Sequence, residues 1–213
     1  MTISFLKFKN AFPRSEREKI AVDSSIISLF SRDILGVDLP ADIASFFDEL
    51  GGGYFGGNDL YFFCDGKEEM SRDSFQEWNG KDFWRDIFPP SADGGPVFFA
   101  ETSFGDQIGY RLVDGEYIYI IFLIDAFESF VIAKNGSELF ENVLTERFAL
   151  VDERRLIGME KNYGRLKEGM HFAPIVSPLL GGKGNVENFC METPNVHFRT
   201  AIATFKSIQK GGR

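Results

Sequence analysis

Glu116-Tyr-Ile-Tyr-Ile-Ile-Phe-Leu-Ile124 is the most strand-prone run of the chain, because it consists almost entirely of β-branched and aromatic residues. The dipeptide Asp114-Gly115 precedes it and favours a two-residue hairpin turn, since both positions tolerate positive φ. Residues 107–112 and 97–101 read as strands on one side of the turn, and residues 127–132 as a strand after the run. These segments predict an antiparallel meander at the centre of the fold.

Helical patterns lie on both sides of this meander. Ile43, Phe46, Phe47 and Leu50 fall at i, i+3, i+4 and i+7, which makes one apolar stripe, and Gly51-Gly-Gly53 ends the helix. Similar spacings precede Gly36, follow Asn135 and follow Pro194. We therefore expect an α+β fold in which one mostly antiparallel, twisted sheet is flanked by helices at its N- and C-terminal sides.

The chain is expected to have three parts. Residues 1–24 form an N-terminal arm, residues 25–148 an α+β domain, and residues 149–213 a C-terminal extension packed on the same domain. Within the extension, we expect an exposed helix to about residue 167, an irregular loop over residues 169–184, a short strand over 186–192 and a terminal helix.

The composition excludes several classes of protein. The longest apolar run, residues 117–124, is too short to cross a bilayer, so no membrane partner is expected. The N-terminus lacks the pattern of a secretory signal and the two cysteines are far apart, which together predict a cytoplasmic, reduced chain. No basic stripe is present to neutralise phosphates, so we expect no nucleic-acid partner.

Acidic residues are concentrated in the middle of the chain. Residues 38–133 carry nineteen Asp or Glu and five Lys or Arg, in a chain whose net charge is −9. Such a segment can be a solvated face that promotes solubility. It can also be a surface that attracts a basic partner.

Few residues suggest catalysis. Only two histidines occur, His171 and His197, and both are expected to be structural or exposed. No Cys/His spacing typical of a metal site is present, so we predict no metal, no cofactor and no catalytic residue. Carboxylate pairs flanking turns (Glu101 with Asp106, Asp125 with Glu128) leave a glycosidase as a remote alternative.

Two stretches resemble the SUKH superfamily. Leu39-Pro-Ala-Asp-Ile-Ala-Ser-Phe-Phe-Asp-Glu-Leu-Gly-Gly-Gly53 is similar to its opening of Leu-Pro, amphipathic helix and Asn-Gly-Gly. Val97-Phe-Phe-Ala-Glu-Thr-Ser-Phe-Gly-Asp106 is similar to its next hallmark, a strand and turn with Phe-Ala, an acid and Gly-Asn/Asp. With the hairpin and the segment 132–144, the resemblance covers about residues 25–148. Gly51 replaces the usual Asn, and Glu101 the commoner Asp.

The tail adds a second resemblance. Phe172-Ala-Pro-Ile-Val-Ser-Pro-Leu-Leu-Gly-Gly182, followed by Asn188, His197 and a terminal helix, is similar to the C-terminal region of immunity proteins associated with type VI secretion effectors. The two resemblances imply a non-enzymatic, cytoplasmic immunity protein that binds a cognate toxin domain, such as a nuclease, and blocks it. The superfamily also contains adaptor-like and regulatory members, so a module with a non-toxin partner is the alternative.

The acidic centre leads to a specific hypothesis for the contact surface. We expect it to bind a basic face of the toxin, because charge complementarity accelerates association and adds specificity. Two aromatic residues would serve as anchors beside the acids. The predicted contact residues are Tyr54, Phe55, Asp59, Glu101, Asp106, Asp114 and Glu116.

Overall fold

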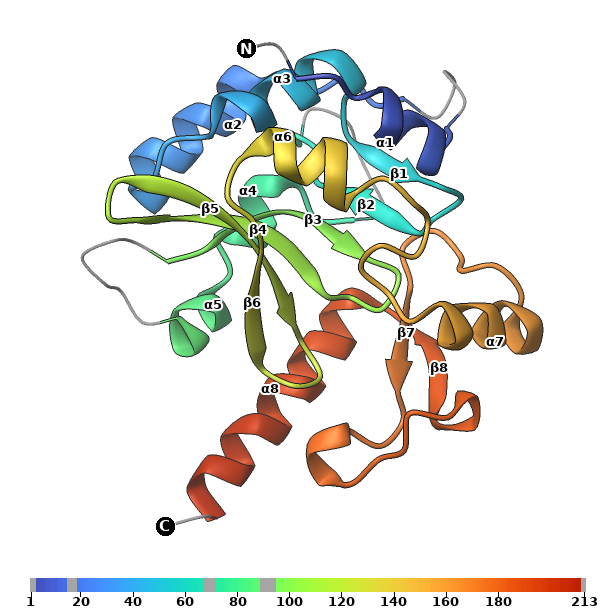
Figure 1. The fold of residues 1–213 in the computed structure, drawn as a ribbon. Helices are drawn as coiled ribbons and strands as arrows, with labels where there is room; N and C mark the ends of the chain where they lie inside the picture. The colour runs from blue at the N-terminus through green and yellow to red at the C-terminus, as the bar shows by residue number, and fades with distance from the viewer. Residues whose placement is uncertain (1–2, 15–18, 67–71, 89–94, 212–213) are drawn as a thin grey trace.

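The structure is a computed structural model that describes residues 3–14, 19–66, 72–88 and 95–211. The strands are β1 (Gly53–Phe55), β2 (Leu60–Phe62), β3 (Val97–Thr102), β4 (Gln107–Val113), β5 (Glu116–Leu123), β6 (Glu128–Ala133), β7 (His171–Pro174) and β8 (Phe189–Glu192). The first six form one antiparallel sheet in chain order, and β7 pairs with β8 in a second, two-stranded sheet. The expected α+β fold is confirmed (Figure 1).

Helices precede, interrupt and follow the sheet. The α-helices are α1 (Leu6–Ala11), α2 (Ser24–Phe30), α3 (Ala41–Leu50), α4 (Phe75–Asn79), α5 (Asp82–Ile87), α6 (Gly136–Glu138), α7 (Glu153–Tyr163) and α8 (Pro194–Gly211). Two π-helical turns, η2 (Ser31–Leu35) and η3 (Leu139–Val143), continue α2 and α6, and two 3₁₀ turns, η4 (Pro178–Leu180) and η5 (Val186–Asn188), precede β8.

The hairpin between β4 and β5 forms as its sequence predicts. Val113 pairs with Glu116 across a two-residue turn. Asp114 and Gly115 both have positive φ, 53° and 82°. This is the backbone conformation that an Asp-Gly dipeptide adopts at low cost, and it fixes the register of the two longest strands.

Both faces of the six-stranded sheet are covered, which explains why β2 and β3 are buried along their whole length. On one face, Phe46 of α3 stacks on Phe62 of β2, with ring centroids 4.3 Å apart. On the other face, Trp78 of α4 stacks on Phe63 and meets Phe198 of α8 edge to face. The many phenylalanines therefore form two aromatic layers with the sheet between them.

A second, smaller apolar cluster is separate from the main core. Leu156 and Met159 of α7, Leu166, Phe172 of β7 and Phe189 of β8 are buried around Phe104, which belongs to the turn between β3 and β4. The turn between β3 and β4 therefore contributes to the core of residues 149–211, which we call the C-terminal segment. Figure 1 shows α7, β7 and β8 of this segment beside that turn.

The C-terminal segment departs from the expectations in three places. β7 lies in the stretch 169–184 that we expected to be irregular, and residues 186–188 form a 3₁₀ turn instead of the start of a strand. The helix expected to be exposed to about residue 167 ends at Tyr163 and buries Leu156 and Met159. The four residues of β7 carry little local signal and depend on pairing with β8. Among the described residues, no helix combines the length and apolarity needed to cross a membrane.

Candidate functional site

An ion pair between Arg72 and Glu101 lies inside the molecule. Arg72 precedes α4 and Glu101 is on β3, and their side chains are 3% and 1% exposed. The guanidinium also lies over the ring of Tyr61, with its carbon 4.7 Å from the ring centroid. Gln107 Nε2 donates to Glu101 Oε2 at 3.0 Å, and Trp78 Nε1 donates to Gln107 Oε1 at 2.6 Å. The charge of Glu101 is thus enclosed by internal partners.

Both histidines of the chain adjoin this pair. His171 is on β7 and His197 is in the first turns of α8, and both are buried. His171 Nε2 lies 3.4 Å from Arg72 Nη2 and 3.2 Å from Glu101 Oε1. The two Nδ1 atoms are 3.3 Å apart, and His197 Nε2 is 3.1 Å from Asp125 Oδ1. We call Arg72, His171, His197 and Asp125 the polar chain.

The two ends of the polar chain are consistent with one arrangement of its protons. Arginine only donates and an ionised carboxylate only accepts, so we assign the hydrogen bonds along the chain to point from Arg72 towards Asp125, although the acceptor Glu101 Oε1 also lies 3.2 Å from His171 Nε2. His171 then accepts at Nε2 and donates from Nδ1, and His197 accepts at Nδ1 and donates from Nε2. Burial, followed by the charge of Arg72, lowers the pKa of His171 well below its ordinary value, which agrees with a neutral ring.

The turn between β3 and β4 is shaped to fit these rings. Gly105 has a φ of +82°, and a Cβ atom there would lie 2.6 Å from His171 Nδ1 and 3.0 Å from His197 Nδ1. Ser103 O accepts from the backbone N–H of Phe172, which ties the turn to β7. Glu101 and Gly105 therefore both serve the docking of the C-terminal segment on the sheet.

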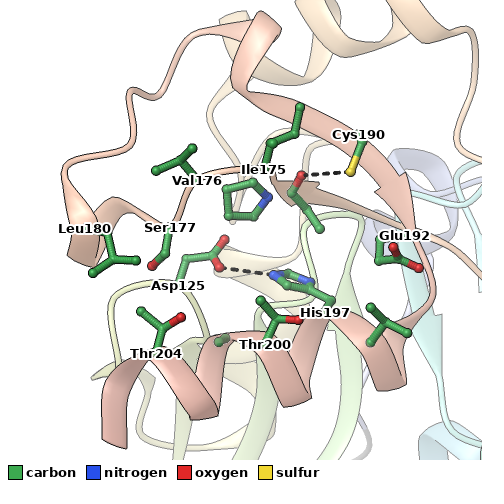
Figure 2. Close-up of a pocket in the computed structure, with 14 residues that line it drawn as sticks. Asp125, Ile175, Val176, Ser177, Leu180, Cys190, Glu192, His197, Thr200 and Thr204 are labelled. Carbon is green, nitrogen blue, oxygen red and sulfur yellow. Dashed lines mark hydrogen bonds and ion pairs between the residues drawn. The ribbon is translucent and has the colours of Figure 1, made fainter. Parts of the chain in front are cut away.

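The polar chain ends at a groove. The groove has a volume of about 400 Å³ and lies between the segment 173–180, β8, the first half of α8 and the turn after β5. Figure 2 shows Asp125 and His197 at its floor, with Thr200 and Thr204 of α8 beside them. Four apolar side chains on its walls are strongly exposed: Ile175 (63%), Val176 (46%), Leu180 (63%) and Val196 (48%).

The wall that carries three of these residues is held by Asn188. Its Oδ1 accepts from the N–H of Val176 at 2.9 Å, and its Nδ2 donates to the carbonyls of Val176 and Lys183 at 2.9 and 2.8 Å. Gly182 packs so closely that a Cβ atom there would overlap the carbonyl of Val176. The exposed apolar residues of this wall are therefore presented by a loop that is fixed by hydrogen bonds.

Two ionisable groups at or near the groove have raised pKa values. Burial, and then Glu192, raises the pKa of the Cys190 thiol, which disfavours the nucleophilic thiolate. Burial, followed by the negative charge of Asp125, raises the pKa of Asp106 to about 7, but Asp106 accepts from the N–H of Ile124 and does not line the groove. In the described ranges, no group of three or more His, Cys, Asp or Glu side chains is arranged to hold a metal ion.

Several predicted contact residues are internal, which corrects the expected surface. Glu101 is buried and paired with Arg72. Asp59 is 5% exposed and takes a bidentate contact from Arg147, at 2.6 Å from Nε and 2.9 Å from Nη2. Neither carboxylate is available to bind a partner, because each is buried and forms an ion pair with an arginine that lies far away in the sequence.

The other predicted residues do not form one surface. Phe55 is buried among core rings, and the Tyr54 hydroxyl accepts from the N–H of Gly169. Asp114 and Glu116 are exposed at the β4–β5 turn. That turn and the β1–β2 turn lie at opposite ends of the sheet in Figure 1. Tyr54 and Asp106 are half-buried, so of the predicted contact residues only Asp114 and Glu116 are exposed.

The residues that sequence reasoning missed are those of the polar chain and the groove. The sequence does not indicate a role for Arg72, and it predicts two structural or exposed histidines without any relation to each other. One signal was available: both histidines lie within or next to the tail segment that resembles immunity proteins, as does Asn188.

Comparison with known proteins supports the fold alone. No protein-family model matches the chain, and a comparison with curated proteins finds no match. Among solved structures, the chain is similar to the crystal structure of Atu4351 from Agrobacterium tumefaciens, with a TM-score of 0.60 and 16% sequence identity. The match covers 93% of this chain and 88% of that chain, so the similarity includes the C-terminal segment as well as the six-stranded sheet.

The buried ion pair gives a first test. Glu101→Gln leaves the Arg72 charge buried without a counter-charge, and we expect it to lower the free energy of unfolding by about 3–5 kcal/mol. The double variant Arg72→Met/Glu101→Leu removes both charges and should recover most of that loss. Urea unfolding of the three proteins measures both values. Equal losses in the single and double variants would contradict the assigned pairing.

Gly105 allows a matched comparison with Gly115, because both have a φ of +82° but nothing lies within 4 Å of a Cβ atom at Gly115. Gly115→Ala should cost about 1–2 kcal/mol, the penalty of a left-handed alanine. Gly105→Ala adds overlap with both histidines and should cost about 1–3 kcal/mol more. Urea unfolding checks the difference, and equal costs would show that the histidines do not pack on this turn.

Asp106 predicts a pH dependence. Its pKa rises from 3.8 to about 7 on folding, so the native state holds this proton more tightly than the unfolded state between these values. The free energy of unfolding of the wild type relative to Asp106→Asn should therefore fall as pH rises from about 4 to about 7, by on the order of 2–4 kcal/mol, and stay constant above. The opposite contribution of His171 cancels between the two proteins. A pH-independent difference would contradict a raised pKa.

Proposed function

We propose that this chain is a non-enzymatic immunity protein that binds a cognate toxin domain in the cytoplasm and neutralises it. The resemblance to SUKH immunity proteins supports this class of function. The observation that carries the proposal is the groove, because the tail segment similar to type VI immunity proteins supplies its fixed wall, through residues 173–182 and Asn188, and its floor, through His197.

The groove has the features of a protein-binding surface. Ile175, Val176, Leu180 and Val196 lie around one depression with 46–63% of each residue exposed. Clustered apolar side chains at a concave surface are typical of interaction sites, whereas isolated exposed ones are common on any protein. The hydrogen bonds of Asn188 fix the loop before binding, so little conformational entropy would be lost on association.

The charge of the groove suits a partner with a basic face. Its lining contains the carboxylates of Asp125 and Glu192 and, among the described residues, neither lysine nor arginine. Charge complementarity with a basic toxin surface is thus retained from the sequence-based hypothesis, but at the C-terminal groove instead of at Glu101 and Asp59.

A survival assay tests the function. The reading frames next to this gene are expressed in a heterologous bacterium to find one that kills, and this chain is then co-expressed. We expect the chain to restore growth and to co-purify with that toxin as a stoichiometric complex. If no neighbouring product is both toxic and bound, the proposal fails and a regulatory interaction module becomes the better reading.

Matched variants test the surface. Ile175→Glu/Leu180→Glu should abolish protection and weaken toxin binding by at least about tenfold, because both residues lie on the groove wall. Leu6→Glu/Leu29→Glu changes residues of similar exposure (59% and 50%) on α1 and α2 and should leave protection intact. Asp114→Lys/Glu116→Lys tests the hairpin acids. Loss of protection in the hairpin variant, with protection retained in the groove variant, would transfer the contact surface to the hairpin.

A further inference from the structure

We infer that the groove receives a cationic side chain flanked by aliphatic residues, on an exposed segment of the partner, with the positive charge placed against Asp125. The inference rests on the proposed function in one respect, namely that the segment belongs to the toxin. It specifies the kind of sequence that the groove binds: a short Leu-Arg-Leu type instead of an acidic or a purely apolar one.

The position of Asp125 favours a cation. One carboxylate oxygen accepts from His197 Nε2 at 3.1 Å, and the side chain remains 21% exposed at the floor of the groove. The contact with His197 uses one oxygen of Asp125, and within the described ranges no hydrogen bond to the other oxygen is seen, while the polar chain behind the carboxylate fixes its orientation. A charge-assisted hydrogen bond from a guanidinium to a carboxylate held in this way is stronger than one between neutral groups.

The electrostatic surroundings of Asp125 also favour a cation. Its charge contributes to the raised pKa of Asp106, so the two carboxyl groups are close enough to interact. Arg155 acts on Asp106 from the side of α7 but does not line the groove. The described lining contains the carboxylates of Asp125 and Glu192 and neither lysine nor arginine, so a positive charge entering the groove would meet a negative potential.

The shape of the groove determines what accompanies the charge. The volume of about 400 Å³ is at the lower end of the range for ligand pockets, so it fits a few side chains and not a folded element. Leu180 lines the groove from the loop wall and Val196 from α8, and Figure 2 shows Thr200 and Thr204 along the same helix. Aliphatic residues on either side of the cation would contact the walls, and the hydroxyls would accept from its remaining N–H groups.

A peptide titration tests this inference on the full chain. The ¹⁵N-labelled protein is titrated with N-acetyl-Leu-Arg-Leu-amide and with the same peptide carrying citrulline, which has the shape of arginine without its charge. We expect shift changes centred on Val176, Val196 and Thr200, and binding of the arginine peptide about tenfold tighter than of the citrulline peptide. N-acetyl-Gly-Arg-Gly-amide should bind more weakly than the leucine peptide, because it lacks the apolar contacts.

Variants show which carboxylate causes the preference for the arginine peptide. Asp125→Asn retains an oxygen that can accept from His197 and should reduce the preference for arginine over citrulline to near unity, and Glu192→Gln should reduce it less. The preference should also shrink at high salt in the wild type. Equal binding of both peptides by the wild type would overturn the cationic occupant. Absence of any shift in the groove would overturn the whole inference, whereas the immunity function would still be decided by the survival assay.

Discussion

Burial of the Arg72–Glu101 ion pair is the constraint on which the arrangement of this protein depends. Two charges removed from water need neutralisation and further hydrogen bonds, and most of these are supplied from elsewhere in the chain: Gln107 from β4, the ring of Tyr61 from β2 and His171 from the C-terminal segment. The C-terminal segment in turn has only a small apolar cluster of its own, completed by Phe104 of the large sheet. The polar chain, Phe104 and the packing of Phe198 of α8 on Trp78 together fix how the segment sits on the sheet, and with it the walls of the groove.

The SUKH-like strand and turn acquires a physical explanation from this arrangement. Glu101 is the acid of that motif and Gly105 its glycine, and both face the histidines of the C-terminal segment. The acid supplies the buried counter-charge for Arg72, and the glycine supplies both a left-handed backbone and the space for two imidazole rings. A motif read from the sequence as an exposed acidic turn is thus a docking turn, whose function is to hold the tail that builds the groove.

Much of the fold is predictable because it depends on interactions between residues that are close in the sequence. Much of the site is not, because it depends on contacts between residues that are far apart in the sequence. The Asp114-Gly115 turn and the apolar stripe of α3 depend on neighbouring residues, so the sequence indicates them directly. Whether an acid is buried depends on a partner that the sequence does not locate: Arg147 reaches Asp59 across 88 positions, and His197 reaches Asp125 across 72. β7 was missed for the same reason, since its four residues are stabilised by β8 and not by their own propensity.

The concentration of acids between residues 38 and 133 therefore does not make a correspondingly acidic surface, as composition alone would indicate. Glu101 and Asp59 are neutralised internally and Asp106 holds its proton up to about pH 7, so these three acids give the surface much less charge than their number implies. Asp125 differs from them, because His197 Nε2 orients one of its carboxylate oxygens while the side chain stays 21% exposed at the groove. Around it, Asn188 holds a loop of exposed apolar residues in place, although burying them would favour the free protein. A fixed negative charge and a rigid apolar wall thus lie together on one side of the molecule, because the histidines dock the tail there. The proposed contact with a toxin depends on this arrangement.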